Sequence, residues 1–228
     1  MTLTVRTRSC NDKLYEKMRS FIPEHINCVS HTDYSHWTDA AKFIYDAITA
    51  TDDILLINDE DSFIVNWKEV EAIANFIKEE NIIFCGVPDS GVVTHRNFDW
   101  VTANPCFVFF NCKLIKDTIK LFPNFSFDNI GNFKYYQETM IKHKPDFIFG
   151  SCNTGNDEPF NGLFHFLAER GNPLYLNATT LGDGLTSEIK GLTNNVIVSL
   201  HTWMSRDKSL ENVERINKIY EYAKSIKS

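Results

Sequence analysis

The sequence predicts an α/β protein with a mixed, mainly parallel sheet flanked by helices and a small antiparallel region in the second half. Two observations predict this class. Strand-like segments alternate with amphipathic helical segments through the first half of the chain, as in parallel strands joined by right-handed helical crossovers. Two strands are continuously apolar, Ile54 to Ile57 and Ile82 to Val87, which indicates a sheet covered on both faces.

The remaining elements of the first half follow in order. Two shorter strands are expected at Leu3 to Thr7 and Ile26 to Ser30. Helices are expected where apolar residues recur at three- and four-residue spacing, over Lys13 to Phe21, from a Thr38 cap through Ile48, and over Trp67 to Lys78.

The second half is less regular. Strands are expected at Cys106 to Phe110, Leu174 to Asn177 and Val196 to Leu200, and helices at Lys113 to Leu121, Pro159 to Arg170 and Leu210 to Ile226. The segment from Asn124 to Lys134 is expected to be a loop, and the glycine-rich residues 179–191 to be mobile.

Size and charge exclude several classes of protein. The 228 residues suffice for one large domain with a substantial core. With 23 basic and 30 acidic residues the formal net charge is −7, so no nucleic-acid partner is expected. No apolar run reaches the roughly 20 residues that span a bilayer, and the N-terminus lacks a signal-peptide core. We therefore expect a cytoplasmic protein with no transmembrane segment.

Carboxylates follow the apolar strand that ends at Ile57. Asn58 leads into Asp59-Glu60-Asp61, and ligands of open α/β sheets bind beyond the carboxyl ends of strands. Two aspartates separated by one residue repel each other unless a cation lies between them, and hard divalent cations prefer such oxygen ligands. An acidic loop that caps the next helix is the alternative interpretation.

Two further features carry possible chemistry. Asp157 and Glu158 open a predicted helix, where they are either ordinary capping residues or a general base facing a substrate. His201 ends a predicted strand and is either structural or a metal ligand. Trp203 and Arg206 beside it are either a packed aromatic and a surface charge or residues that hold an anionic ligand containing a ring, because guanidinium matches phosphate geometry.

The order of these features resembles the GT-A fold glycosyltransferases, DxD-containing enzymes that depend on a nucleotide-sugar. The resemblance extends over about Leu3 to Arg206 and rests on motif order. It implies a GT-A-like, Rossmann-like single catalytic domain over residues 1–228. Residues 1–110 would bind the nucleotide-sugar, residues 111–206 would form the acceptor and catalytic half, and residues 207–228 would be a terminal helix.

The resemblance also implies an activity: metal-dependent transfer of a sugar from a nucleotide-diphosphate sugar to an acceptor hydroxyl, on a glycan or another acceptor. Asp59, Asp61 and His201 would hold Mn²⁺ or Mg²⁺, and Asp157 or Glu158 would be the catalytic base. The remaining donor-binding positions implied are Thr7, Arg8, Asp33, Lys42, Asn58, Trp203 and Arg206.

Two alternatives stay open. Phosphatases of the haloacid dehalogenase type also place a DxD after an apolar strand, but that family usually has Thr or Val two residues after its second aspartate, where this chain has Phe63. A non-catalytic nucleotide-sugar-binding module of a larger, multidomain protein would keep the same fold, and the charged terminal helix could lead into a further domain.

Overall fold

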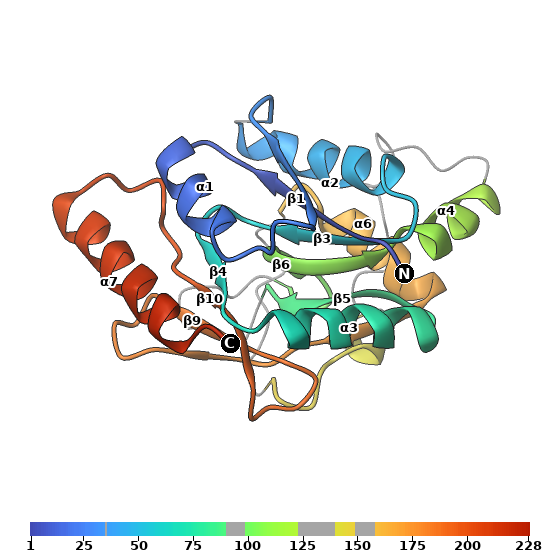
Figure 1. Ribbon diagram of the computed structural model, residues 1–228. Helices are drawn as coiled ribbons and strands as arrows, with labels where there is room; N and C mark the ends of the chain where they lie inside the picture. Colours follow the sequence, from blue (N-terminus) through green and yellow to red (C-terminus); the bar gives the residue numbers. More distant parts are fainter. Residues whose placement is uncertain (35, 90–98, 123–139, 149–157) are drawn as a thin grey trace.

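A six-stranded sheet with strand order β2-β1-β3-β6-β5-β7 runs through the centre of the structure (Figure 1). The structure is a computed structural model that describes residues 1–34, 36–89, 99–122, 140–148 and 158–228. The strands are β1 (Leu3–Arg8), β2 (Asn27–His31), β3 (Ile54–Asn58), β5 (Ile82–Pro88), β6 (Ala103–Asn111) and β7 (Asn172–Tyr175). Only β6 runs antiparallel to its neighbours within this sheet. The predicted mixed, mainly parallel α/β class is confirmed.

Helices follow the strands along the chain, and the last of them comes after the final strand. They are α1 (Asp12–Arg19), α2 (Ala40–Thr49), α3 (Trp67–Glu79), α4 (Cys112–Lys120), α6 (Asn161–Arg170) and α7 (Leu210–Ile226). Asn11 and Asn66 cap α1 and α3, since each side chain accepts a backbone N–H of the first turn. The predicted Thr38 cap is wrong: a 3-10 turn at Trp37–Asp39 precedes α2, and the cap residue is Asp39. Among the described residues, no helix combines the length and apolar character that membrane crossing requires.

A smaller antiparallel sheet with strand order β4-β10-β9-β8 lies beside the first. Its strands are β4 (Ser62–Ile64), β8 (Ala178–Thr180), β9 (Ser187–Lys190) and β10 (Ile197–His201). The predicted antiparallel region of the second half is therefore present. The expectation that residues 179–191 are mobile is wrong, because β8 and β9 pair with each other and β9 pairs with β10. The predicted loop from Asn124 to Lys134 lies outside the described residues.

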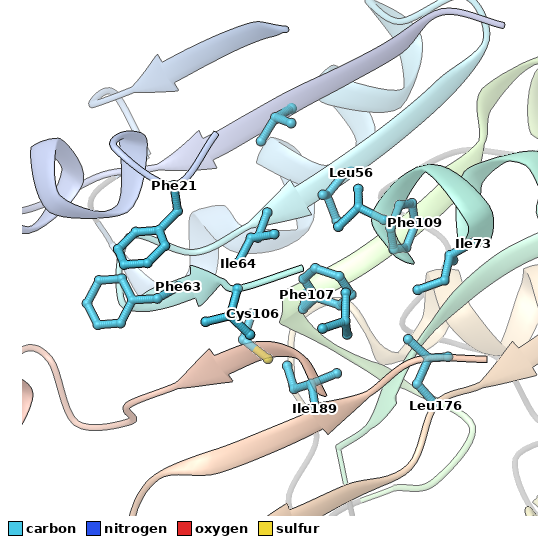
Figure 2. Packing of buried hydrophobic residues seen from close by; sticks show 14 of the residues in the cluster. Phe21, Leu56, Phe63, Ile64, Ile73, Cys106, Phe107, Phe109, Leu176 and Ile189 are labelled. Carbon is cyan, nitrogen blue, oxygen red and sulfur yellow. The ribbon is translucent and has the colours of Figure 1, made fainter. Parts of the chain in front are cut away.

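Two apolar clusters cover the two faces of the large sheet. One contains residues of α2, α4 and α6. The other contains residues of α1, α3 and α7 and also of the small sheet. Figure 2 shows Phe63 of β4 beside Phe21, with ring centroids 5.4 Å apart, and Ile189 of β9 in the same cluster. The two sheets therefore share a core, and residues 59–61 connect β3 of the large sheet to β4 of the small sheet.

Candidate functional site

The turn that joins the two sheets contains the predicted acidic motif. β3 ends at Asn58 and β4 begins at Ser62. The buried amide of Asn58 donates to the carbonyl oxygens of Asp59 at 3.1 Å and Ser62 at 2.9 Å. The backbone N–H of Asp59 donates to the carbonyl of Cys106 on β6 at 3.1 Å. Hydrogen bonds thus fix the turn at the carboxyl end of β3, where α/β sheets bind ligands.

Glu60 has a different partner from the aspartates on either side of it. Its Oε2 accepts hydrogen bonds from Ser9 Oγ at 2.7 Å and from the backbone N–H groups of Cys10 and Asn11 at 2.9 Å. Three donors from the segment before α1 therefore satisfy this buried carboxylate. Glu60 ties the acidic turn to the start of α1.

The structure brings Asp59, Asp61 and His201 together. His201 is the last residue of β10 and pairs in register with Ser62, so the small sheet carries the imidazole to the acidic turn. His201 Nε2 lies 3.3 Å from Asp61 Oδ1. All three side chains are lining residues of one cavity of about 360 Å³.

Burial and neighbouring charges give the two aspartates different acidities. Burial, with the charge of Asp61 adding to it, raises the pKa of Asp59 to about 6 despite the opposing effect of Arg8. Burial alone would also raise the pKa of Asp61, but the charge and hydrogen bond of His201 outweigh it and lower that pKa. Two carboxylates thus share the site while only one is stabilised as an anion by a direct ion pair.

The pKa of the His201 imidazole is also shifted by burial and by neighbouring groups. Burial alone would lower the pKa of His201, but Cys106 and the Asp61 carboxylate raise it well above its usual value. A protonated His201 therefore compensates the charge of Asp61 in the protein alone. A cation bound between them would take over that role.

Three of the predicted donor-binding residues also line this cavity: Arg8 at the end of β1, Trp203 and Arg206. Arg8 approaches Asp59 closely enough to lower its pKa. Two guanidinium groups thus face the same space as the acidic pair, and guanidinium suits phosphate oxygens. Glu158, one of the two predicted base residues, lines the cavity as well. Asp157 lies outside the described residues.

The other predicted donor-binding residues lie elsewhere. Thr7 is fully buried in β1. Asp33 is exposed after β2, and Lys42 on the surface of α2 pairs with Asp46. Asn58 is buried and shapes the acidic turn. None of these four is a lining residue of the cavity as the described part of the chain forms it.

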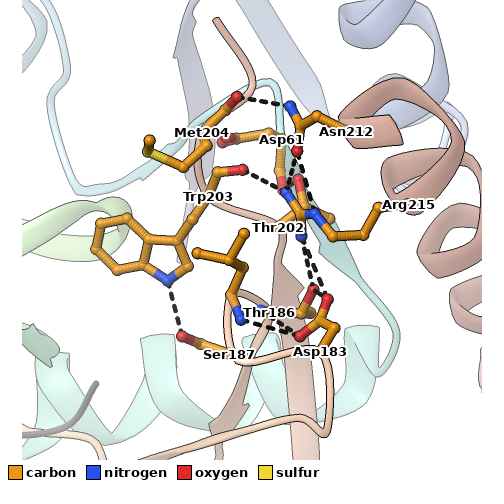
Figure 3. A network of polar contacts seen from close by, with 10 residues as sticks. Asp61, Asp183, Thr186, Ser187, Thr202, Trp203, Met204, Asn212 and Arg215 are labelled. Atoms are coloured by element: carbon orange, nitrogen blue, oxygen red, sulfur yellow. Dashed lines mark hydrogen bonds and ion pairs between the residues drawn. The ribbon is translucent and has the colours of Figure 1, made fainter. Parts of the chain in front are cut away.

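A left-handed turn follows His201 and forms one wall of the cavity. Trp203 and Met204 have φ angles of 47° and 59°, which are unfavourable for residues other than glycine. Arg215 of α7 donates to the carbonyl of Trp203 at 2.8 Å, and Asn212 donates to the carbonyl of Met204 at 2.8 Å (Figure 3). These bonds hold the turn in place.

Further contacts hold the turn at Trp203 and Met204 in place. Trp203 Nε1 donates to Ser187 Oγ of β9 at 2.8 Å, and the indole lies against the His201 ring with centroids 4.2 Å apart. Arg215 is itself held by Asp183 at 3.3 Å and by Thr186 at 3.1 Å (Figure 3). The sequence offers no local signal for Arg215, because an arginine on a charged helix is usually a surface residue.

The lining of this cavity contains donor groups of the kinds that bind divalent cations in proteins. Two carboxylates and an imidazole face one space, and such oxygen and nitrogen ligands suit Mn²⁺ or Mg²⁺. Within the described residues, no three His, Cys, Asp or Glu side chains are already arranged around a common point. His201 would have to be neutral for these residues to hold an ion, because a metal ligand is an unprotonated imidazole nitrogen.

Comparisons with known proteins gave structural likenesses at low identity. No family model matches the sequence, and no curated protein matches it significantly. The crystal structure of a glycosyltransferase involved in the glycosylation of the major capsid of PBCV-1 is 13% identical, with a TM-score of 0.46 over 97% of this chain and 100% of that one. The crystal structure of A197 from STIV is 13% identical, with a TM-score of 0.40 over 89% and 94% of the two chains. Likeness at this level carries no conclusion about residues or activity.

Proposed function

We propose that the protein is a metal-dependent glycosyltransferase that moves a sugar from a nucleotide-diphosphate sugar to an acceptor hydroxyl. One observation carries this proposal: Asp59, Asp61 and His201, from two different sheets, line a single cavity together with Arg8, Arg206 and Glu158. The cavity lies at the carboxyl end of β3, the edge at which such sheets bind ligands. Its volume of about 360 Å³ is within the usual range for small-molecule sites.

The cationic side chains would bind the donor. Arg8 and Arg206 would pair with the phosphate oxygens of the donor, because guanidinium makes charge-assisted hydrogen bonds to them. Asp59, Asp61 and His201 would hold Mn²⁺ or Mg²⁺. A divalent ion there supplies positive charge that stabilises the departing nucleoside diphosphate.

A further acidic residue of the lining would serve the acceptor. Glu158 would take the proton of the acceptor hydroxyl while the oxygen of that hydroxyl bonds to the anomeric carbon of the sugar. The bond from that carbon to the diphosphate oxygen breaks with its electron pair on the leaving group, so the charges balance. The indole of Trp203, held by Ser187, would form an apolar wall beside the reacting groups.

Ligand-dependent stability tests the donor and the metal. We expect one or more of UDP-, GDP- and dTDP-sugars to raise the melting temperature in Mn²⁺ and not in EDTA, because a ligand that binds only the folded state stabilises it. Asp61→Asn should abolish the Mn²⁺-dependent shift. Glu79→Gln, which removes an exposed carboxylate at the end of α3, is the matched control and should keep it.

The same experiment separates the alternatives. Suppose that Asp61→Asn keeps the Mn²⁺-dependent shift in melting temperature and has the far-ultraviolet circular dichroism of the natural chain. Asp61 would then not be part of a metal and donor site, and the proposal would be overturned. Nucleotide-sugar binding without slow hydrolysis or transfer would favour the non-catalytic module. Release of phosphate from simple phosphoesters, with no response to any nucleotide-sugar, would favour the phosphatase.

A further inference from the structure

A second cavity, of about 330 Å³, lies beside the first, between α1 and α7. Its apolar wall comes from Leu14 of α1 and from Val213 and Ile216 of α7. Leu14 and Ile216 are buried, whereas Val213 is 42% exposed. An apolar surface of this kind is left open to solvent only at some cost. The cavity therefore suits a ligand with an apolar part.

Three lysines line the same cavity as this apolar wall. Lys13 and Lys17 come from α1, and Lys208 comes from the segment before α7. Lys17 already contacts Asn217 and lies 4.9 Å from the centre of the Tyr220 ring. Lys13 and Lys208 are exposed, and neither forms an ion pair with any residue that the structure describes. In a chain with a net charge of −7, this grouping gives the cavity a local positive potential.

The acidic residue in the same wall, Asp207, keeps its charge and offsets part of that potential, but the hydrogen bonds of its carboxylate go to Ser209 and not to the lysines. Asp207 Oδ1 accepts the backbone N–H of Ser209 at 2.9 Å, and its Oδ2 accepts the Ser209 hydroxyl at 3.1 Å. The carboxylate is thus engaged with the residue that caps α7. The ammonium groups of Lys13 and Lys208 remain available to a ligand.

The second cavity shares a wall with the candidate catalytic cavity. Ser205 and Asp207 line both, so a ligand seated between α1 and α7 would reach toward the acidic turn from that side. We propose that this cavity binds a small amphiphile, an apolar chain that ends in a phosphate or carboxylate, and that it is the docking site of the acceptor. The acceptor role rests on the proposed function, whereas the binding does not.

Charge complementarity and size select this occupant. An anionic head matches the lysines through charge-assisted hydrogen bonds, and each methylene that enters the apolar wall adds favourable burial. The volume suits a single small ligand. A neutral apolar ligand would leave the lysines unused, and a bare anion would leave the apolar wall exposed.

Calorimetric titration of the metal-free protein with octyl phosphate, without nucleotide-sugar, tests the binding. We expect the natural chain to bind octyl phosphate more tightly than either octanol or inorganic phosphate. The double variant Lys13→Gln, Lys208→Gln should bind it about tenfold more weakly, the loss expected for two charge-assisted contacts at a solvent-exposed rim. Lys68→Gln with Lys218→Gln makes the same charge change at exposed positions away from the cavity and should leave the affinity unchanged.

Several outcomes would overturn the proposal. They are no binding of octyl phosphate, equal binding of octanol or of inorganic phosphate, and equal affinity in the two double variants. Asp61→Asn separates this proposal from the proposed function, because it should lose nucleotide-sugar binding and keep octyl phosphate binding. If the natural chain binds a nucleotide-sugar but not octyl phosphate, the second cavity is not a binding site for the amphiphile and the proposed function still stands. If the natural chain binds octyl phosphate but no nucleotide-sugar, the cavity is not an acceptor site.

Discussion

At the scale of single residues, Asp59 combines burial with a neighbouring carboxylate. Its pKa is raised to about 6 by burial, with Asp61 adding to the effect, against about 3.9 in an unfolded chain. A carboxyl group with a raised folded-state pKa stabilises the fold fully below pH 4, and that contribution is lost as the pH rises through 6. The charged form of Asp59 therefore costs stability at neutral pH, which is common at functional sites.

We predict that Asp59→Asn stabilises the metal-free protein at pH 7.5 by up to about 3 kcal/mol, the value of a pKa shift of this size. The gain should be much smaller at pH 4.5, where the native carboxyl is protonated. Urea denaturation of the natural chain and of the variant at pH 7.5 and pH 4.5 measures the change in free energy of unfolding at each pH. Asp52→Asn is the control, since that side chain is exposed. An equal gain at both pH values, or a loss at pH 7.5, would contradict the electrostatic account.

The second residue-scale prediction concerns the base. Glu158 lines the candidate cavity, and general-base help is typically worth about 10²–10⁴-fold in rate. We predict that Glu158→Gln lowers transfer by a factor in this range while leaving Mn²⁺-dependent nucleotide-sugar binding intact. Asp157→Asn, the adjacent acidic residue, should be nearly silent. Transfer at the natural rate in both variants would place the base elsewhere or favour a retaining reaction, and the reverse pattern would assign the role to Asp157.

At the scale of elements, α7 contributes to the site although it lies outside the predicted catalytic region. Through Arg215 and Asn212 it holds the left-handed turn at Trp203 and Met204. That turn forms a wall of the cavity directly after His201. Residues held in such conformations cost about 1–3 kcal/mol each and persist only where their surroundings impose them. We infer that α7 positions this wall.

We predict that Arg215→Ala lowers the affinity for the nucleotide-sugar at temperatures well below unfolding, because the turn loses its hydrogen bond to the guanidinium. The variant should also lose about 1–3 kcal/mol of stability, the cost of leaving buried acceptors unpaired. Arg215→Lys should recover part of the affinity, and Lys218→Ala on the same helix should change neither quantity. A loss of stability with unchanged affinity would reduce Arg215 to a structural role.

The elements that the sequence predicts well are those with a strong local pattern. The apolar run at Ile54 predicts β3, and the spacing of apolar residues from Trp67 predicts α3. β4 has three residues, too few for any periodicity, and its identity comes from pairing with β10. The short strands β8 and β9, which flank the glycines at 182 and 184, likewise depend on pairing with each other and with β10. Local composition predicts mobility there, and tertiary pairing overrides it.

The same distinction applies to the candidate site. Asp59 and Asp61 could be located because they directly follow a buried strand, and His201 because it ends another. Lys42 could not be excluded from sequence, because its pairing with Asp46 depends on which face of α2 meets solvent. Arg215 could not be found, because its partners at Asp183 and Trp203 come from other elements. The ends of strands can be predicted from local sequence, whereas the residues that support a site from other elements are known only from the packed fold.

At the scale of the whole molecule, the site depends on two sheets that have no strand in common. The acidic turn belongs to the connection between β3 and β4, and His201 comes from the far end of β10. Their relative placement is fixed by the pairing of Ser62 on β4 with His201 on β10 and by the shared apolar cluster, which contains Phe63 of β4 and Leu200 of β10 together with Leu56 of β3. Because one core supports both sheets, we expect them to unfold together.

Phe63→Ala tests this coupling. The ring is fully buried, and its centroid lies 5.4 Å from that of Phe21 and 5.6 Å from that of Tyr220, so it links β4 to the segment after α1 and to α7. We predict a loss of about 3–5 kcal/mol, typical of a buried phenylalanine replaced by alanine, in a single transition with coincident circular dichroism and tryptophan fluorescence. Phe76→Ala, at a side chain 37% exposed, should cost far less. Two separate transitions in Phe63→Ala would mean that the small sheet folds independently of the large sheet, and the coupling through the shared core would then be wrong.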